Sequence, residues 1–468
     1  MDYRVLKKPR AALVCFVVAF VAVAFLGRSA YYRLWASPPS TADSIPGWDY
    51  EITPRPTGPS LLFPVRLDPP ADDRSWHAHN ARATAALFRC LERADCAPNQ
   101  TKVVILQGWH FRAVLDGYLG GEGIWARSTV IALRRLGYTY LYNDGGLDPM
   151  VRLYRVFAPL VRAVVVDAPD AHACFRDPYC VLRREWAWGI PIWKILSFHY
   201  WAYADHPLGR KWTLSPEPYL PAPDNNTYLG YSVQPSCTQQ PFIPHAQRSP
   251  TGNSRRKQIY IYAKTADYFS PEKRAFPPHV FARLSAALGV DFVVGVQEAD
   301  AVLPAGVANL GGMGPARFYE AVARSWVLMG MGAPSTSPTP YDALCLGVPF
   351  INPILTWDPA HPDDRSKWEA QHEALKHLGP PHVYNVFKDD EDGLERAVRA
   401  ALDAPLLDRY ILPRMELDAV QARVGAILET DWRSAAEAVL AARVKAAAEK
   451  GPGDGEETED EMLFWIGP

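Results

Sequence analysis

The chain has 468 residues, 48% of them hydrophobic, which is enough to build the cores of two or three domains. Its 49 Lys and Arg residues are balanced by 51 Asp and Glu residues, and the formal net charge of −2 argues against a nucleic-acid-binding protein. The counts of 15 Trp and 22 Tyr are high. Aromatic faces stack on sugars or bases, but aromatic side chains belong more often to a core.

The N-terminal residues predict a membrane anchor. Residues 1–10 are basic, and the uncharged run after them, AALVCFVVAFVAVAFLG, is just long enough to cross a thin bilayer once Tyr31 and Tyr32 are added. Because most positive charges precede this run, we expect a cytosolic tail, a signal-anchor over 11–32 and a luminal remainder. The alternative is a cleaved signal peptide, which would place Arg28 at an unfavourable position three residues before the cut.

A luminal position determines how the cysteines are interpreted. Six cysteines follow the anchor, and an even number in an oxidising compartment predicts disulfides. Short spacing favours Cys90–Cys96 and Cys174–Cys180, although the pairing does not follow from sequence. Cys345 lies on the apolar side of a predicted helix, where we expect a buried free thiol. There is no CxxC motif and no paired histidine, so no metal site is predicted.

Other segments are consistent with a luminal chain. Asn99 and Asn225 each begin an Asn-X-Thr triplet and are predicted glycosylation acceptors. Residues 33–75 are rich in proline and predict a stem that holds the folded part away from the membrane. Residues 446–468 are acidic with little apolar content, which predicts a disordered tail.

Residues 76–245 predict a first α/β half. A helix over 76–94 precedes the apolar strand VVIL, a glycine-rich loop, a helix over 124–136 and a second strand. This β-α-β order places the glycine-rich loop at the ligand end of a parallel sheet. The loop does not contain GxGxxG, so a dinucleotide fingerprint is not supported.

Glu122 stands among glycines directly before the second helix. It either complements the helix dipole or provides a carboxylate in the cleft, which suits general-base chemistry. His110 directly follows the first strand and is the alternative base.

An aromatic stretch follows over 183–232, with five tryptophans at irregular spacing among Arg, Lys, His and Tyr. Flat rings beside hydrogen-bonding groups are typical of carbohydrate sites. Packing between domains is the alternative, and it is the commoner role for any single tryptophan.

A polar, Pro- and Ser-rich linker leads to a second α/β half over 256–445, which we expect to include two terminal helices. Its first strand runs into a loop with Lys264. Residues 312–353 predict a helix, a short buried strand, an irregular loop, a second helix opened by Pro340 and another strand. A helix start at this edge suits a phosphate, and Asp342 could accept hydrogen bonds from ribose hydroxyls; a turn without a ligand is the alternative.

The two halves resemble a GT-B glycosyltransferase, in which two Rossmann-like domains face across a cleft. Five segments, in the same order, resemble glycosyltransferase family 18, the branching N-acetylglucosaminyltransferases. They are LGGEGIWARSTVIALRRLGY, HPLGRKWTLSPEPYLPAPDNNTYLGYSV, IYIYAKTADYF, GPARFYEAVARSWVLMGMGAPSTSPTPYDALCLGVPFINP and QHEALKHLGPPHVYNV. They extend over most of residues 100–430, and the second and fourth are long enough to be specific.

The resemblance implies roles for particular residues. Glu122 falls on the family's catalytic base, after a shorter loop, and Lys264 falls in a loop that faces the donor phosphates. Asp342 replaces a glutamate of the nucleotide-side helix and keeps the carboxylate. Thr336 replaces a second donor-binding glutamate and loses its charge, which leaves the donor sugar open. Lys367 matches a donor-site lysine, and Trp212 lies in a segment that could contact the acceptor sugar.

The resemblance also implies an activity. It predicts a single-pass type II enzyme of the Golgi membrane that moves GlcNAc from UDP-GlcNAc to a mannose 6-hydroxyl of an N-glycan on a glycoprotein. Transfer would proceed with inversion and without a metal or other cofactor. Two alternatives are open: a GT-B transferase with another nucleotide sugar, and a non-catalytic luminal glycan-binding protein of the same fold, for which Thr336 is the best support.

Overall fold

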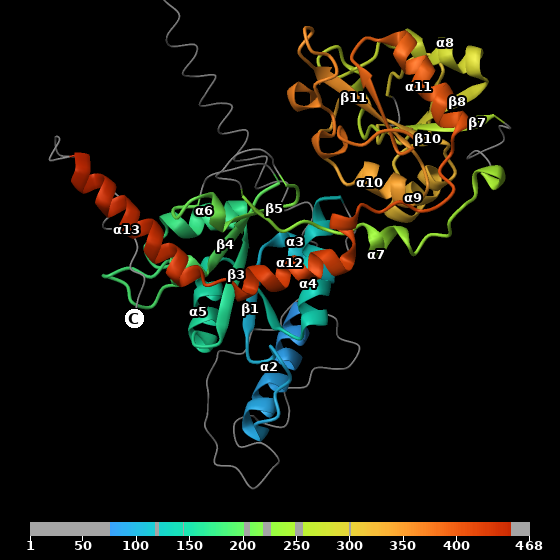
Figure 1. Ribbon diagram of the computed structural model, residues 1–468. Helices are drawn as coiled ribbons and strands as arrows, with labels where there is room; N and C mark the ends of the chain where they lie inside the picture. Colours follow the sequence, from blue (N-terminus) through green and yellow to red (C-terminus); the bar gives the residue numbers. More distant parts are fainter. Residues whose placement is uncertain are drawn as a thin grey trace, which may run out of the picture. The chain divides into compact units, whose positions relative to one another are not determined.

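The N-terminal half is built on a six-stranded parallel sheet with the strand order β2-β1-β3-β4-β5-β6 (Figure 1). The central strands β1 (Val103–Gln107) and β3 (Val161–Asp167) are buried along almost their whole length, as the continuous apolar runs predicted. The other elements of this half are α2 (Trp76–Arg93), α3 (Trp109–Leu115), η1 (Gly121–Gly123), α4 (Ile124–Leu136), β2 (Thr139–Asn143), α5 (Leu147–Phe157), α6 (Ala168–Arg176), η2 (Ile192–Lys194), β4 (Ile195–Phe198), η3 (Arg210–Trp212), β5 (Thr213–Ser215) and β6 (Thr227–Tyr228).

This computed structural model describes residues 75–117, 121–143, 145–200, 206–218, 226–248, 256–298 and 301–450, all within one compact unit, Pro59–Pro468. The predicted cytosolic tail, signal-anchor and stem lie outside these residues, apart from Ser75. Among the residues described, no helix combines the length and the apolar character needed to cross a membrane. The last helix continues to Lys450, so the first residues of the predicted disordered tail are helical.

The C-terminal half contains a seven-stranded sheet with the order β12-β11-β10-β7-β8-β9, and β13 also pairs with β11. All pairings are parallel except that of β12 with β11. The elements from the connection onward are α7 (Gln234–Cys237), η4 (His245–Gln247), β7 (Lys257–Ile261), η5 (Ala266–Phe269), α8 (His279–Leu288), β8 (Val290–Val294), β9 (Val307–Asn309), α9 (Pro315–Ala323), β10 (Val327–Met329), α10 (Thr339–Cys345), β11 (Phe350–Thr356), η6 (Arg365–Lys367), β12 (Glu369–Ala370), η7 (Glu373–Leu375), β13 (Val383–Phe387), α11 (Glu391–Asp403) and η8 (Pro413–Met415).

The local predictions from apolar periodicity and caps are confirmed in both halves. The predicted helix over 124–136 is α4, residue for residue, and Gly137 ends it in a left-handed conformation. Residues 312–353 fold in the predicted order as α9, β10, α10 and β11. Parallel α/β sheets are therefore the architecture of both halves.

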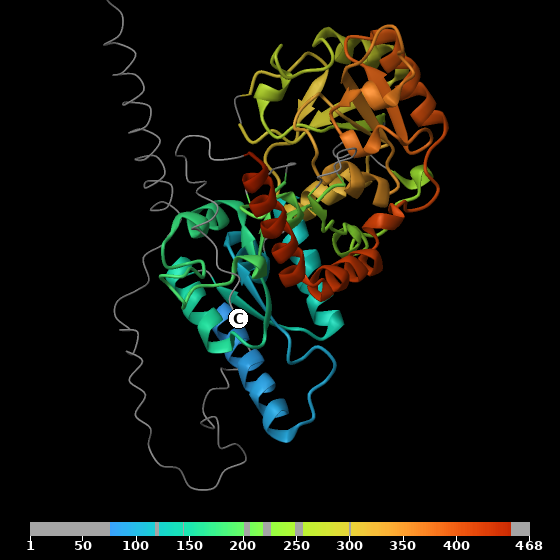
Figure 2. The same ribbon diagram turned by 60° about the vertical axis from the view of Figure 1, so that its left-hand side comes forward.

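The two terminal helices, α12 (Leu417–Glu429) and α13 (Trp432–Lys450), contact the N-terminal half. α12 packs along α4, as both views show (Figures 1 and 2), and the Arg162 guanidinium donates to the carbonyl of Leu428 at 2.6 Å. Assigning these helices to the 256–445 half was therefore wrong. An amphipathic helix reveals in its sequence that one face will be buried, but not which partner buries it.

The structure contains three disulfides among the described residues, Cys90–Cys96, Cys174–Cys180 and Cys237–Cys345. The first two are the pairs that short spacing favoured. The expectation of a free thiol at Cys345 was wrong, because its partner lies 108 residues earlier, at the end of α7. Spacing cannot reveal a pair that only the packing of α7 against α10 brings together.

Trp212 does not contact a sugar site. Its side chain is 0% exposed, and its ring lies 5.9 Å from that of His206 and 5.4 Å from that of Trp432 in α13. The predicted acceptor role is therefore wrong, and the alternative of core packing holds. An indole in a loop motif has the same sequence pattern whether a ligand or a returning helix covers it.

Candidate functional site

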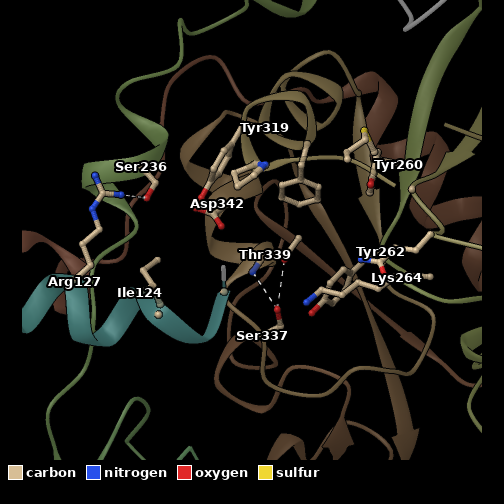
Figure 3. Close-up of a pocket in the computed structure, with 18 of the residues that line it drawn as sticks. Ile124, Arg127, Ser236, Tyr260, Tyr262, Lys264, Tyr319, Ser337, Thr339 and Asp342 are labelled. Atoms are coloured by element: carbon tan, nitrogen blue, oxygen red, sulfur yellow. Dashed lines mark hydrogen bonds between the residues drawn. The ribbon is translucent and has the colours of Figure 1, made fainter. Parts of the chain in front are cut away.

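A pocket of about 470 Å³ is lined by residues of both halves (Figure 3). The N-terminal half contributes the segment from the end of α3 through η1 to the first turn of α4, and the C-terminal half contributes loops that follow β7, β8 and β10. The described residues that line it are Gly117, Gly121, Gly123, Ile124, Arg127, Ser236, Tyr260, Tyr262, Ala263, Lys264, Gly295, Gln297, Met313, Pro315, Phe318, Tyr319, Ser337, Thr339 and Asp342.

The position of the pocket follows from the topology of the C-terminal sheet. β7, β8 and β10 run parallel, so their carboxyl ends open on the same edge. Lys264 follows β7, and the amide of Gln297, after β8, donates to the Lys264 carbonyl at 3.3 Å. The predicted site residue Lys264 therefore reaches the pocket, where its side chain is exposed.

Asp342 reaches the pocket from the first turn of α10 but is almost entirely buried, with 5% exposure. The Tyr319 hydroxyl donates to its Oδ1 at 3.4 Å, from α9. Burial raises the pKa of the Asp342 carboxyl to about 8, although the bond from Tyr319 favours the ionised form. Asp342 is therefore a carboxyl group that binds its proton unusually tightly.

We expect Asp342→Asn to stabilise the protein at alkaline pH. Because the folded pKa is raised, the native state binds this proton more tightly than the unfolded state, and stability falls as pH rises from about 4 to about 8. Asparagine mimics the neutral form and removes that loss, so at pH 9 the variant should gain a few kcal/mol, at about 1.4 kcal/mol per pKa unit. Urea unfolding at pH 5 and pH 9 measures the difference; a variant less stable than wild type at both pH values would contradict it.

A second group of polar side chains forms the end of the pocket near α7 (Figure 3). The guanidinium of Arg127 donates to Ser236 Oγ at 2.8 Å and to the carbonyl of Pro235 at 3.2 Å. Tyr319 lies on the same side and links this group to Asp342. Of the described lining residues, Arg127 and Lys264 are the cations, and Asp342 is the acid.

The backbone of Glu122 is placed at the pocket. It is the central residue of η1, and the glycines on both sides of it, Gly121 and Gly123, line the cavity. Its side chain lies outside the part of the structure that is described. The Tyr200 hydroxyl donates to the carbonyl of Gly121 at 3.1 Å, which ties η1 to the end of β4.

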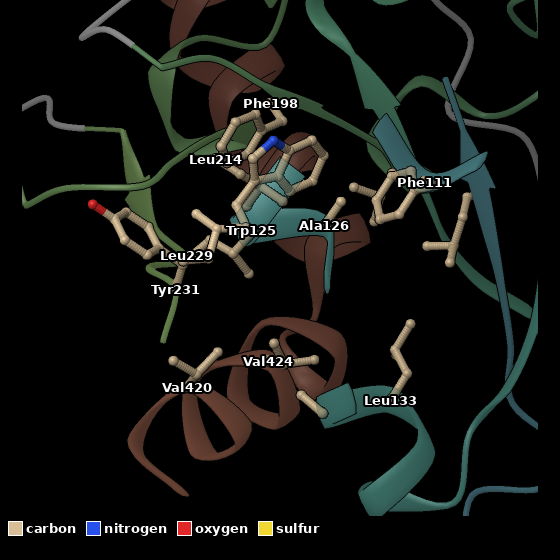
Figure 4. Packing of buried hydrophobic residues seen from close by; sticks show 14 of the residues in the cluster. Phe111, Trp125, Ala126, Leu133, Phe198, Leu214, Leu229, Tyr231, Val420 and Val424 are labelled. Atoms are coloured by element: carbon tan, nitrogen blue, oxygen red, sulfur yellow. The ribbon is translucent and has the colours of Figure 1, made fainter. Parts of the chain in front are cut away.

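The start of α4 is held by a buried tryptophan (Figure 4). Trp125 is 0% exposed and stacks on Phe198 of β4 with ring centroids 3.6 Å apart. Val420 and Val424 of α12 pack in the same cluster. The segment around Glu122 is therefore attached to the buried core of the N-terminal half.

His110, the alternative base, carries a carboxylate partner. Its Nδ1 lies 2.8 Å from Asp167 Oδ2 at the end of β3, and that oxygen also accepts from the His110 amide at 3.4 Å. Gly108 has φ +126°, and a Cβ there would collide with the Asp167 carboxylate, so glycine is needed for this approach. A carboxylate at Nδ1 leaves the lone pair on Nε2, as in a general base. The His110 ring lies 5.7 Å from that of Trp125, and His110 is not among the described residues that line the pocket.

Three predicted donor residues are not brought to the pocket surface. Thr336 is 8% exposed, with φ +52°, and its amide donates to the Gln371 carbonyl at 3.1 Å. Pro340 is buried within α10. Lys367 pairs with Asp358 at 2.6 Å in η6. None of the three is among the described lining residues.

Of the two predicted glycosylation residues, the structure describes Asn99 alone. Asn99 has φ +64°, and its side-chain amide donates to the carbonyl of Leu136 at 3.0 Å, where it helps to end α4. Asn225 lies outside the described residues. The structure therefore gives Asn99 a local structural role whether or not it carries a glycan.

Sequence reasoning missed Arg127, Ser236 and Tyr319. A signal for Arg127 was available, because Ile124 and Arg127 are three residues apart and share a face of α4. No comparable signal marks Ser236, which reaches the pocket only because α7 packs against α10.

A family model agrees with this architecture. Residues 199–437, just over half of the chain, match the model of glycosyltransferase family 18. The chain belongs to glycosyltransferase family 18.

The curated relatives include alpha-1,6-mannosylglycoprotein 6-beta-N-acetylglucosaminyltransferase A from Homo sapiens and from Cricetulus griseus. The human protein is 23% identical over 235 residues and the Cricetulus griseus protein 24% identical over 238 residues. Each alignment covers 47% of this chain and 30% of the relative, so this chain matches less than a third of their length.

Solved structures that this chain matches at TM-scores below 0.5 include a spinosyn forosaminyltransferase and the UDP-GlcNAc 2-epimerase from Methanocaldococcus jannaschii. The first has a TM-score of 0.36 at 15% identity and covers 74% of this chain and 99% of its own. The second has a TM-score of 0.42 at 10% identity and covers 70% of this chain and 99% of its own.

Proposed function

We propose that this glycosyltransferase is an inverting, metal-independent enzyme of the GT-B type. It moves GlcNAc from UDP-GlcNAc to a mannose 6-hydroxyl of an N-glycan. The observation that carries the proposal is a single pocket lined by the glycines on both sides of Glu122 from one half, and by Lys264 and Asp342 from the other. Family membership and the names of the curated relatives support the donor and the acceptor.

In this proposal the N-terminal half provides the catalytic base and the C-terminal half binds the donor nucleotide. Glu122 takes the proton of the acceptor hydroxyl as that oxygen attacks the anomeric carbon of the donor. The leaving diphosphate gains charge in the same step, and the Lys264 ammonium stabilises it. The Ser337 and Thr339 hydroxyls are hydrogen-bonded to each other at 3.4 Å and line the same pocket as Lys264. They can donate to phosphate oxygens. Asp342 accepts from a ribose hydroxyl.

Charge balance supports chemistry without a metal. A diphosphate carries at least two negative charges, and Arg127 and Lys264 bring two positive charges to the same cavity. The independence from metal is a prediction, which activity in EDTA tests directly.

A second candidate is a family member that uses another nucleotide sugar. Arg127 favours it, because this guanidinium lines the same pocket as Asp342 and could bind an anionic or strongly polar group on the donor. A non-catalytic glycan-binding protein is the third candidate, and calorimetry with UDP separates it from the other two, since a pure glycan lectin shows no heat with UDP.

A donor screen tests the proposal. Wild-type protein is incubated with UDP- and GDP-sugars in EDTA, with Lys264→Met and Lys273→Met as matched variants. Lys273 is an exposed lysine that pairs with Asp267 outside the pocket. We expect turnover of UDP-GlcNAc by wild type and Lys273→Met, and a loss of about 100-fold in Lys264→Met, the scale of one charge-stabilising group. Turnover only with added Mn²⁺ would contradict the metal-free mechanism, and turnover of another donor alone would reassign the substrate.

We further propose a Golgi location, with the folded part luminal and anchored by residues 11–32. Three disulfides support an oxidising compartment. Detection of the intact N-terminus in the membrane fraction, with the sequons glycosylated, is the corresponding test.

A further inference from the structure

A buried carboxyl group lies behind α10, the helix that carries Asp342. Glu217 follows β5 in the N-terminal half, is 3% exposed, and does not line the pocket as described. Its Oε1 accepts from the Tyr231 hydroxyl and its Oε2 from the Tyr341 hydroxyl, both at 3.1 Å. Arg414 reaches Oε2 at 3.7 Å and donates to the Tyr341 hydroxyl at 3.0 Å.

These four residues come from four separate parts of the chain. Glu217 belongs to the N-terminal half, and Tyr231 to the segment where the chain leaves that half. Tyr341 lies in α10, and Arg414 in η8, where the chain returns toward α12. The chain passes between the two halves twice, near Tyr231 and near Arg414. Glu217 thus connects both of these segments to α10, the helix that lines the pocket.

Burial of Glu217 is unfavourable by itself. It raises the pKa of the carboxyl to about 7, although Arg414 and the two tyrosine hydroxyls favour the ionised form. A buried acid of this kind contributes little to stability compared with an apolar side chain of similar volume. General stability therefore does not explain a carboxyl group at this junction.

The cluster is coupled to the pocket surface through Tyr341. The next residue in α10 is Asp342, which lines the pocket. The Tyr341 ring also meets the His372 ring edge-on at 4.8 Å, and His372 Nε2 lies 3.1 Å from the Ser337 carbonyl. Burial lowers the pKa of His372 to about 3, so the imidazole is neutral and donates to that carbonyl. Tyr341 therefore supports two pocket-lining residues.

We propose that Glu217 is a positioning residue for the nucleotide sugar: from the N-terminal half it fixes Tyr341, and through Tyr341 it sets Asp342 and Ser337 in the pocket. The inference rests on the proposed function, because it takes α10 to be the wall that contacts the donor. In this proposal a residue of the N-terminal half determines the position of α10, a helix of the C-terminal half.

Two tyrosines provide a matched pair of variants. Tyr231 and Tyr341 are each 1% exposed and donate to the same carboxyl group at the same distance, but only Tyr341 lies in α10. Tyr231→Phe and Tyr341→Phe each remove one hydrogen bond to Glu217, and Tyr341→Phe also removes the hydroxyl that accepts from Arg414. Glu217→Gln keeps the shape of the side chain and leaves only one acceptor oxygen.

The test measures the Kd of the full-length chain for UDP by calorimetry, the KM and kcat for UDP-GlcNAc, and the unfolding midpoint. We expect Tyr341→Phe and Glu217→Gln to raise the Kd and the KM at least 5-fold with kcat within about 2-fold, as for lost uniform binding. Tyr231→Phe should leave the Kd for UDP and the KM for UDP-GlcNAc within 2-fold of wild type. It should lower the unfolding midpoint about as much as Tyr341→Phe does.

Two other results distinguish a failure of the positioning role from a failure of the proposed function. A wild-type chain that binds UDP, with Tyr341→Phe binding it equally well or Tyr231→Phe weakening it by the same factor, would overturn the positioning role alone. A wild-type chain that binds no UDP would overturn the proposed function and the positioning role with it.

Discussion

Glu122→Gln is expected to abolish sugar transfer while UDP still binds. The amide has nearly the same shape as the carboxylate but cannot take the proton of the acceptor hydroxyl. General-base catalysis contributes about 10²- to 10⁴-fold, so kcat should fall by that factor. The Kd for UDP should change little, because the predicted donor contacts of Lys264 and Asp342 come from the other half. Transfer assays beside calorimetry with UDP measure both quantities.

His110→Gln is the matched comparison. The His110–Asp167 pair is hydrogen-bonded as a general base would be, but His110 is not among the described residues that line the pocket. We expect this variant to retain most of its activity. Near-normal transfer by Glu122→Gln, together with a deep loss in His110→Gln, would move the base from Glu122 to His110.

Removal of the Cys237–Cys345 disulfide is expected to have the largest effect on stability. The two cysteines are 108 residues apart, and the chain-entropy model gives about 4.7 kcal/mol for closing a loop of about 100 residues. The bond also attaches α7, which carries Ser236, to the C-terminal end of α10. The Cys237→Ala/Cys345→Ala double variant should therefore unfold at markedly lower urea concentration and bind UDP more weakly.

The Cys90→Ala/Cys96→Ala variant controls for the loss of a disulfide as such. Its cysteines are only 6 residues apart, so the same model gives about 2 kcal/mol, and the pair lies at the end of α2, remote in sequence from the pocket segments. Equal shifts of the unfolding midpoint in the two variants would contradict the loop-length argument. Unchanged UDP binding in the first would show that α10 keeps its place without the bond.

Local structure and half of the candidate site were predictable. The α4 helix over 124–136 has an apolar face and a glycine stop, and these are properties of adjacent residues. Lys264 and Asp342 each follow an apolar strand, and the ends of parallel strands share one edge. The prediction that Trp212 contacts a sugar was wrong, because Trp432, which packs against it, is distant in the sequence.

The sequence by itself determined the family and two α/β halves built on mainly parallel sheets. It also determined their helices and strands, and the loops at the carboxyl ends of the strands. Apolar periodicity and glycine positions express these features within a few residues of one another. The tertiary structure alone decided that α12 returns to α4, that Cys345 pairs with Cys237, and that Arg127, Ser236 and Tyr319 line one pocket with Asp342. It also placed the Glu217 carboxyl between Tyr231 and Tyr341. These contacts join residues that are 14 positions apart, as Glu217 and Tyr231 are, 124 apart, as Glu217 and Tyr341 are, or still more distant, as in α4 and α12. Only the packing of complete elements brings such residues together.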